Sequence, residues 1–226
     1  MKVLLTGTNK GFGASICAAF QERGVEVVSL NRKSSGESGG GAYYSDFENL
    51  ENLELVMKSL SEDNRDLDAV ILNAGVLGPL GATSRIPLAE LEQVLKVNFY
   101  ANKVIADVLI NNTNVKSFIQ ISSGASERVY EKWAAYGLSK MLLRRLFDFY
   151  RLEHTGRNFV VVSPGALATG MNAEIRSANN LDVEWMTKFE NPSKLGSAEV
   201  MGSRLVELFL AGGLPSSEIL FDLCAD

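Results

Sequence analysis

The sequence predicts an α/β protein, a Rossmann-like doubly wound parallel sheet of seven strands flanked by helices on both faces. Two observations predict this class. Short runs such as Val3-Leu4-Leu5 and Ala69-Val70-Ile71-Leu72 are apolar at every position, which is typical of parallel strands buried on both faces. Longer amphipathic stretches separate these runs, as the crossover helices between parallel strands require.

Each element follows from this alternation. The expected strands are residues 2–6, 25–30, 42–45, 68–73, 115–122, 157–163 and 217–221, and the expected helices are residues 11–24, 48–62, 88–112, 134–154 and 196–211. Apolar residues recur in helices 88–112 and 134–154 at close to the 3.6-residue helical period. Serine and glycine predict a surface loop at 34–41, and residues 170–195 are polar and predict an irregular segment.

Length and composition limit the function classes. A chain of 226 residues is expected to form one domain, 1–226, with a small substrate lid at about 168–195. The net charge of −5 opposes nucleic acid as a partner, and no apolar run is long enough to predict a membrane span. Cys17 and Cys224 lack metal-ligand spacing, so we expect reduced thiols, no metal site and a cytoplasmic location.

A glycine-rich loop joins the first expected strand to the first helix. Glycines allow a tight turn and close approach to a pyrophosphate, and the helix N-terminus behind them attracts negative charge. A plain strand-to-helix turn is the alternative reading of these glycines. Their position after the first strand favours dinucleotide binding, with candidate residues Gly7, Asn9, Lys10, Gly11, Phe12 and Gly13.

Two cations indicate which dinucleotide is bound. Lys10 lies in the glycine loop, and Arg32 follows the second expected strand directly after Asn31. An acidic residue at that place holds a ribose 2′-hydroxyl, whereas an arginine accommodates a 2′-phosphate. The alternative is that both are ordinary solvated cations. Together they predict NADP(H) as the cofactor, with NAD(H) as the less favoured choice.

Polar and small residues lie at the ends of two later strands of the predicted sheet. Asn73, Ala74 and Gly75 follow the fourth strand, and Ser123 follows the fifth. Ligands of open α/β sheets bind at this carboxyl edge. Tyr136 and Lys140 then lie four residues apart, on one face of a helix. A half-exposed aromatic residue beside a surface lysine is the alternative reading of this pair.

The tyrosine–lysine pair has a chemical rationale. A free tyrosine keeps its proton until about pH 10, too firmly for an efficient acid or base near neutrality. A neighbouring ammonium stabilises the phenolate, so we expect Lys140 to lower the pKa of Tyr136. Ser123 is then expected to hydrogen-bond the substrate oxygen while Tyr136 delivers or removes its proton.

Taken together, these motifs resemble the short-chain dehydrogenase/reductase family along nearly the whole chain. The resemblance covers the glycine loop, the Asn73-Ala74-Gly75 turn, Asn98, Ser123, the Tyr136–Lys140 pair, and the Pro164-Gly165 turn followed by Thr169. The glycine spacing is that of the non-extended branch. Lys10 and the stretches around Ser123 and Trp133 are similar to NADP-dependent carbonyl, benzil and sepiapterin reductases.

The resemblance implies a role for each matching residue. Tyr136 is implied as the general acid in reduction, Ser123 as the group that orients the carbonyl, and Lys140 as a ligand of the nicotinamide ribose. Asn98 is implied to hold a proton-relaying water, and Asp46 to contact the adenine. The residues implied to position the nicotinamide carboxamide are Pro164, Leu167 and Thr169.

The predicted function is therefore an NADP(H)-dependent carbonyl reductase or alcohol dehydrogenase, acting on a small ketone, aldehyde or secondary alcohol. A non-catalytic NADP-binding redox sensor and a family member acting on an envelope or flagellar sugar precursor are the alternatives. The apolar helices 88–112 and 134–154 predict a homodimer, with a homotetramer as the alternative. Met171, Trp185, Met186 and Phe189 are expected either to line an apolar substrate pocket or to form the underside of a packed loop.

Overall fold

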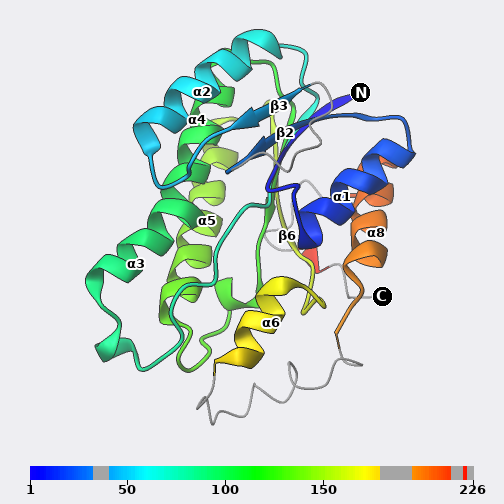
Figure 1. Ribbon diagram of the computed structural model, residues 1–226. Helices are drawn as coiled ribbons and strands as arrows, with labels where there is room; N and C mark the ends of the chain where they lie inside the picture. Colours follow the sequence, from blue (N-terminus) through cyan, green and yellow to red (C-terminus); the bar gives the residue numbers. More distant parts are fainter. Residues whose placement is uncertain (33–40, 179–194, 215–220, 223–226) are drawn as a thin grey trace.

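The computed structural model describes residues 1–32, 41–178, 195–214 and 221–222 (Figure 1). Within these residues the strands form a single parallel sheet in the order β3-β2-β1-β4-β5-β6-β7. This order reverses direction between β1 and β4, as it does in doubly wound nucleotide-binding folds. The predicted fold class is confirmed.

The strands lie close to where the apolar runs predict them. Their bounds are β1 Lys2–Thr6, β2 Glu26–Asn31, β3 Ala42–Tyr44, β4 Ala69–Leu72, β5 Ser117–Ile121, β6 Asn158–Ser163 and β7 Phe221–Asp222. Six of these described strands have three or more residues. The seventh pairs with β6 through two residues only, and residues 217–220 of the predicted last strand lie outside the described part of the chain.

Helices cover both faces of the sheet (Figure 1). One face carries α1 (Gly11–Glu22) and α8 (Ala198–Leu210). The opposite face carries α2 (Leu50–Asp63), α4 (Ala101–Asn112) and α5 (Ala134–Glu153), and α3 (Leu88–Leu95) leads into α4. Two short 3₁₀ turns, η1 (Thr83–Arg85) and η3 (Gly124–Ser126), precede α3 and α5.

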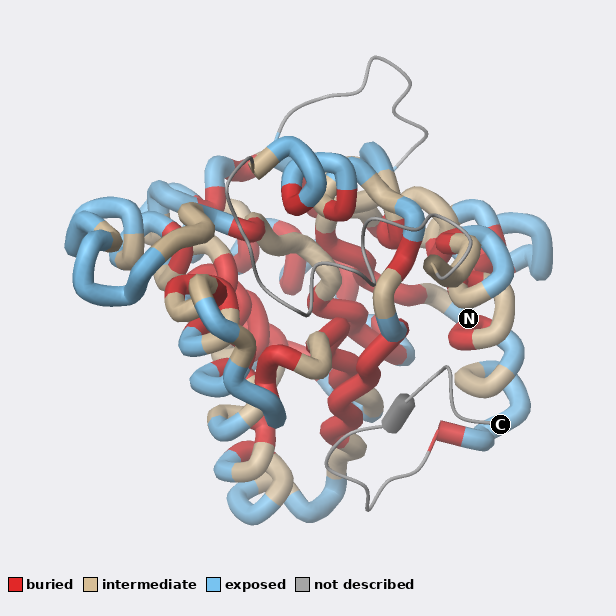
Figure 2. Tube along the Cα trace, turned by 90° about the horizontal axis from the view of Figure 1, so that it is seen from below, coloured by how far each residue is buried: buried red, intermediate tan, exposed pale blue. Residues whose placement is uncertain are grey.

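The hydrophobic core has one layer on each side of the sheet. Alternate side chains of β5 show this, because Phe118 packs into the layer under α4 and α5 while Ile119 packs into the layer under α1 and α8. Figure 2 shows the buried residues gathered along the central strands. Burial on both faces explains why the strands are apolar throughout.

The predicted helix 88–112 is interrupted, which corrects the sequence expectation. It consists of α3, a π-helical turn η2 (Lys96–Tyr100), and α4. The Ala101 amide donates to the Lys96 carbonyl, five residues back instead of four. A π-helical turn adds only one residue to the helix, so the apolar residues before and after it still recur at close to the helical period. The sequence pattern therefore does not reveal the turn. Asn98 lies in the widened turn and is buried.

A helix also replaces part of the segment expected to be irregular. Residues Gly170–Ser177 form α6, whose first turn follows Thr169. The polar composition concealed it, because the buried positions of α6 are limited to Asn172 and Ile175, with Met171 partly buried. The rest of the predicted lid, 179–194, lies outside the described residues.

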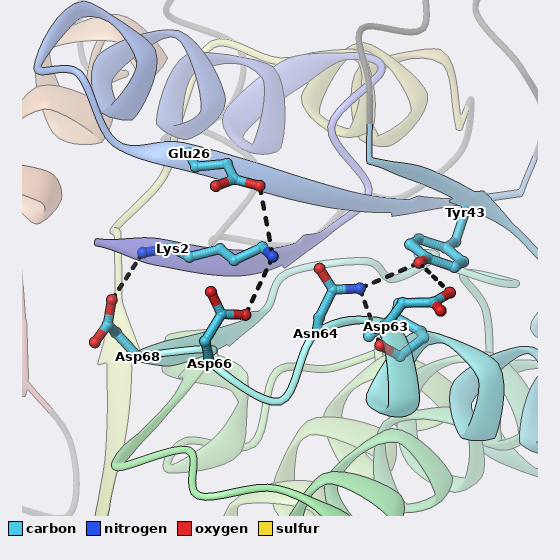
Figure 3. Close-up of polar contacts among 8 residues, drawn as sticks. Lys2, Glu26, Tyr43, Asp63, Asn64, Asp66 and Asp68 are labelled. Atoms are coloured by element: carbon cyan, nitrogen blue, oxygen red, sulfur yellow. Dashed lines mark hydrogen bonds and ion pairs between the residues drawn. The ribbon is translucent and has the colours of Figure 1, made fainter.

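Polar contacts tie the amino edge of the sheet, opposite the loops considered below (Figure 3). The backbone amide of Lys2 donates to the Asp68 carboxylate at 2.7 Å. The ammonium of Lys2 lies 3.2 Å from the Asp66 carboxylate and 3.6 Å from the Glu26 carboxylate. These contacts connect β1 to β2 and to the segment before β4. The carboxyl edge is left for the loops that carry the candidate site residues.

None of the described helices is long and apolar enough to cross a membrane.

Candidate active site

The loops after β1, β4, β5 and β6 leave the same edge of the sheet, because all four strands are parallel and adjacent. The chain turns to α1 on one face after β1, and toward α3 and α4 on the other face after β4. A crevice opens at such a reversal, and ligands of doubly wound sheets bind there. Most of the candidate residues predicted from the sequence are carried by these loops and by α5.

The glycine loop between β1 and α1 depends on the absence of side chains. Gly7 and Gly11 have φ of +75° and +59°, in the left-handed region that favours glycine. A Cβ on Gly13 would lie 2.0 Å from the Gly7 carbonyl oxygen, so a side chain does not fit. Phe12 anchors α1 in the core beneath the loop, while Asn9 and Lys10 are exposed. The exposed backbone and helix N-terminus make a cradle that fits a pyrophosphate.

Thr6 links this loop to the turn after β4. Its hydroxyl oxygen accepts hydrogen bonds from the amides of Asn73 at 3.0 Å and Ala74 at 2.9 Å. The Asn73 side-chain amide donates in return to the carbonyls of Thr6 and Gly7, at 3.0 and 3.3 Å. The structure therefore brings Gly7, Asn73 and Ala74 together. Sequence reasoning missed Thr6, although a hydroxyl at the end of an apolar strand was a signal for it.

The end of β2 is tied to the same loop. The Thr8 amide donates to the side chain of Asn31 at 2.8 Å, and the Asn31 amide donates to the Thr8 hydroxyl at 2.9 Å. Arg32, the next residue, is exposed and starts from a strand end held against the glycine loop. Asp46, after β3, is exposed and accepts a hydrogen bond from the Glu48 amide at 3.1 Å. Lys10, Arg32 and Asp46 are thus exposed residues that follow the three neighbouring strands β1, β2 and β3.

The segment after β6 closes the other side of the cradle. Gly165 has φ of +75°, which turns the chain directly after Pro164. Leu167 is buried and forms a parallel bridge with Gly196. A Cβ on Gly11 would lie 3.7 Å from Thr169, so Thr169 lies over the glycine loop. Residues predicted from opposite ends of the sequence are therefore neighbours.

The candidate catalytic residues converge beside this cradle. Ser123 lies two residues after the end of β5 and caps η3, accepting a hydrogen bond from the Ala125 amide at 3.2 Å. A side-chain hydrogen bond joins Ser123 to Tyr136, on the first turn of α5. The Lys140 ammonium lies one turn further along, 5.6 Å from the centre of the Tyr136 ring, and donates to the Ile121 carbonyl at 2.9 Å.

Asn98 connects the β4 turn to α5. Its side-chain oxygen accepts from the Val76 amide and its nitrogen donates to the Val76 carbonyl, both at 2.8 Å. The same nitrogen donates to the Ser139 hydroxyl at 2.9 Å. Gly75 fits beneath, because a Cβ there would lie 3.1 Å from the Asn98 side-chain oxygen and 3.7 Å from the Lys140 ammonium. Ser139 was not predicted, and its place one residue before Lys140 was the available signal.

Burial dominates the electrostatics of the tyrosine–lysine pair, which corrects an expectation from the sequence. Desolvation raises the pKa of Tyr136 to about 12, and the hydrogen bond from Ser123 opposes this only in part. Desolvation also lowers the pKa of Lys140 to about 8. The expectation that Lys140 lowers the tyrosine pKa is therefore wrong for the protein alone, because both groups are buried and the ammonium bonds a carbonyl instead of the phenol.

An apolar cluster surrounds the Tyr136 hydroxyl end of the site. The Trp133 and Tyr136 rings meet edge to face, with centres 5.6 Å apart, and Tyr130 lies 5.6 Å from Trp133. The cluster consists of Leu77, Ala125, Trp133, Tyr136 and Ile175, with Leu80, Tyr130 and Met171 packed against it. Met171 thus lies in the cluster, as one reading of the sequence has it, whereas Trp185, Met186 and Phe189 lie outside the described residues.

Comparisons with known proteins agree with this arrangement. Residues 1–180 match the model of the short chain dehydrogenase family. A benzil reductase ((S)-benzoin forming) of Bacillus subtilis is 28% identical over 208 residues, 86% of each chain. An NADPH-dependent 3-dehydrocapnine reductase of Ornithobacterium rhinotracheale is 26% identical over 196 residues, 78% of this chain and 69% of the relative. A short-chain dehydrogenase/reductase of Saccharomyces cerevisiae has the same fold, with a TM-score of 0.85 and 21% identity over 99% of this chain and 96% of its own.

The chain belongs to the short-chain dehydrogenase family and is an oxidoreductase of that family, which acts on carbonyl and alcohol groups with a nicotinamide cofactor. The resemblance inferred from its motifs is confirmed. Across the described residues no group of His, Cys, Asp and Glu side chains is arranged to hold a metal ion.

The lowered pKa of Lys140 predicts a pH-dependent stability. Between pH 8 and 10.5 the unfolded chain binds more protons at this lysine than the native protein does, so the free energy of unfolding gains with rising pH in that window. Relative to Lys140→Met, the cofactor-free wild type should gain about 2 kcal/mol between pH 7 and pH 10. Urea unfolding at each pH measures the difference.

The control for this experiment is Lys116→Met, which removes an exposed lysine at the start of β5. The difference in the free energy of unfolding between Lys116→Met and the wild type should not show this rise between pH 8 and 10.5. A pH-independent difference between wild type and Lys140→Met would show that Lys140 titrates alike in the native and unfolded chains.

Proposed function

We propose that this protein is an NADP(H)-dependent carbonyl reductase, reversible as an alcohol dehydrogenase, whose substrate is a small apolar ketone. One observation carries the proposal: the Ser123–Tyr136 hydrogen bond and the Lys140 ammonium lie together at the edge of a glycine cradle shaped for a dinucleotide. A general acid next to a nicotinamide site is the equipment that carbonyl reduction requires.

The residues of the crevice fit the cofactor. Gly7 and Gly13 allow the loop to pack closely on itself and on the Asn73 turn, Gly11 is proposed to leave room for the pyrophosphate, and Thr169 lies opposite, where the carboxamide end of the dinucleotide is expected. Pro164 and Leu167 are proposed to line that end. The exposed Lys10 and Arg32 are proposed to hold a 2′-phosphate, which favours NADP(H) over NAD(H). The relative described as an NADPH-dependent reductase supports this choice.

Each side chain of the site then has a defined task. NADPH, when bound, supplies the hydride that reaches the carbonyl carbon. Ser123 and Tyr136 hydrogen-bond the carbonyl oxygen, and Tyr136 gives it the proton that completes the alcohol. Burial raises the pKa of Tyr136 to about 12 in the cofactor-free protein, so Tyr136 holds its proton before the substrate binds. Lys140 is proposed to hold the nicotinamide ribose and, as a cation, to stabilise the resulting phenolate.

Asn98 is proposed to position the reacting residues and to support proton return to Tyr136. Its side chain is fully engaged by Val76 and Ser139, which leaves its main chain for a water. Its carbonyl oxygen, in the widened π-helical turn, accepts from the Asn102 side-chain amide at 2.9 Å, and the water is proposed to bind at this turn. Asp46 is proposed to contact the adenine from its exposed place after β3.

The walls of the site favour an aromatic substrate. Trp133, Leu77, Tyr130 and Met171 belong to or pack against the apolar and largely aromatic cluster that contains Tyr136, and the substrate is proposed to contact this cluster. Aromatic side chains bind aromatic ligands through edge-to-face and offset contacts. The name of the Bacillus relative, a benzil reductase, agrees with this lining, so benzil is the first substrate to test.

The same observations weigh against the two alternative functions. A redox-sensing protein that binds NADP without turnover has no need for Ser123 beside a buried Tyr136 and Lys140. A sugar precursor needs many hydrogen-bonding groups, whereas the cluster beside Tyr136 is apolar. The single domain spanning 1–226, its lid at 168–195 and the cytoplasmic location remain predictions.

We also propose that the protein is a homodimer formed through α5, with a tetramer as the alternative. The exposed apolar residues of α5 recur on one face of the helix, opposite the buried Tyr136 and Lys140: Leu138, Met141, Leu142, Phe149 and Leu152. Exposed apolar patches of this kind mark interaction surfaces. Sequence periodicity alone did not show that this stripe faces solvent and not the core.

Replacing the tyrosine hydroxyl tests the catalytic proposal. Tyr136→Phe removes the proton donor and should lower kcat for benzil reduction by about 10²- to 10⁴-fold. The affinity for NADPH should stay close to that of the wild type, because the ring and Lys140 are retained. Loss of nicotinamide absorbance measures the rate, and equal rates in wild type and variant would refute the role of Tyr136.

Removing the arginine after β2 tests the cofactor proposal. Arg32→Ala should weaken NADPH binding about tenfold, since one charge-assisted contact contributes about 1.4 kcal/mol. NADH, which lacks the 2′-phosphate, serves as the matched control and should bind wild type and variant alike. Calorimetric titration measures both affinities, and a wild type that binds NADH as tightly as NADPH contradicts the proposal.

Placing a charge in the exposed stripe tests the dimer. Leu142→Glu should give a particle of 24.6 kDa, whereas the wild type should have twice that mass. Light scattering after size-exclusion chromatography measures the mass, and Glu153→Leu at the end of α5 is the control that adds no charge to the stripe. A wild type that stays monomeric at tens of micromolar would disprove this interface.

A further inference from the structure

Asn172 is a buried amide that has no hydrogen-bond partner within the described part of the chain. Its side chain belongs to a residue that is 2% exposed, yet neither its oxygen nor its nitrogen makes a hydrogen bond. Leaving a buried polar group unsatisfied costs about 1–3 kcal/mol, so native proteins retain such groups where a ligand or a water completes them. An apolar side chain of the same size would be more stable at this place. The amide is therefore expected to serve a bound molecule.

The position of Asn172 identifies which molecule that is. It lies on the inner face of α6, one turn before Ile175, whose side chain packs in the cluster that contains Tyr136 and Trp133. Met171, its neighbour in the chain, packs against the same cluster. Helical side chains point toward the helix N-terminus, and α6 begins at Thr169 over the glycine loop. Asn172 is thus a buried residue of the helix that follows Thr169, at the glycine loop, and that packs Ile175 and Met171 against the cluster of Tyr136.

The polar groups closest to the reaction already have partners. Ser123 is hydrogen-bonded to Tyr136, and Lys140 donates to the Ile121 carbonyl. The side chain of Asn98 is held by Val76 and Ser139. A substrate whose reacting carbonyl is bound by Ser123 and Tyr136 has apolar walls around the rest of it. Among the described residues, two buried side-chain amides, Gln120 and Asn172, have no partner at either atom, and Gln120 lies within β5, whereas Asn172 lies on α6, which packs against the cluster of Tyr136.

We propose that Asn172 is a specificity-determining residue, which hydrogen-bonds a second oxygen adjacent to the reacting carbonyl. The substrate class is then the α-diketones and α-hydroxyketones with apolar substituents. This inference rests on the proposed carbonyl reductase function and deepens it.

The chemistry of an amide suits this class. The side-chain NH₂ donates to the oxygen of the carbonyl that is not reduced, which remains an acceptor in the α-hydroxyketone product. The side-chain oxygen accepts from a hydroxyl when the substrate is an α-hydroxyketone. A site built to hydrogen-bond a substrate group discriminates strongly against analogues that lack it. Asn172 would thereby fix which of two neighbouring carbonyls receives the hydride.

A pair of matched substrates tests this role. Benzil has two adjacent carbonyls, and 2-phenylacetophenone has the same two rings with a methylene in place of one carbonyl. Asn172→Leu, similar in size, should lower kcat/KM for benzil about 10- to 100-fold and change that for 2-phenylacetophenone by less than about twofold. The KM for NADPH should not change. Asn112→Leu, at the exposed end of α4, is the control and should leave kcat/KM unchanged for both substrates.

Stability distinguishes a ligand-binding role from a structural one. If Asn172 serves a ligand, Asn172→Leu should raise the midpoint of thermal unfolding of the cofactor-free protein, because it removes an unsatisfied amide. A lowered midpoint together with equal losses for both substrates would mean a structural role and overturn the inference. A weakened affinity for NADPH would assign the amide to the cofactor, and unchanged kinetics would show that it contacts no ligand. Both results contradict the proposal.

The proposed function can fail separately. Benzil binding is measured without turnover by quenching of tryptophan fluorescence in the presence of NADP⁺. A wild type that binds benzil more tightly than Asn172→Leu, but reduces neither substrate, would refute the carbonyl reductase activity and leave the binding role of Asn172 in place. Equal binding by wild type and variant would refute that role, whatever the activity.

Discussion

The site depends on the parallel pairing of β1 with β4, because this pairing sets the glycine loop beside the Asn73 turn. Thr6 and Asn73 join the two strand ends by four hydrogen bonds, and Gly13 can approach the Gly7 carbonyl only without a side chain. The remaining groups are placed relative to this seam. β5 next to β4 brings Ser123 to the same edge, and β6 next to β5 brings the segment of Thr169. A register change at β1 and β4 would therefore displace both ends of the cofactor site together.

Much of this arrangement follows from local features of the sequence. Apolar runs such as Val3-Leu4-Leu5 mark strands whose two faces are both covered, and glycines mark the turn before α1. Parallel order then places the candidate residues at one edge, since every strand of a parallel sheet ends on the same side. Tyr136 and Lys140 share a helix face because they are four residues apart. These inferences need only chain geometry.

Other features depend on tertiary contacts that local patterns do not carry. Four residues of spacing indicate that Lys140 is near Tyr136, but the pKa of each depends on how deeply the surrounding chain buries them. The π-helical turn around Asn98 retains the apolar stripe of its helix and leaves no mark in the pattern. Asn172 looks like an ordinary polar residue in a polar segment, and its isolation emerges only once α6 packs against the cluster. The apolar stripe on α5 is likewise compatible with a place in the core, and only the packed structure shows that it is exposed.

The two faces of α5 carry different sets of side chains on one rigid helix. Tyr136, Ser139 and Lys140 occupy the side toward the sheet, and Leu138, Leu142 and Phe149 occupy the side toward solvent. A rotation of this helix by a few degrees moves both sets at once, in opposite directions. If the proposed dimer forms through α5, the orientation of this one helix sets both the position of Tyr136 and Lys140 and the fit of the interface.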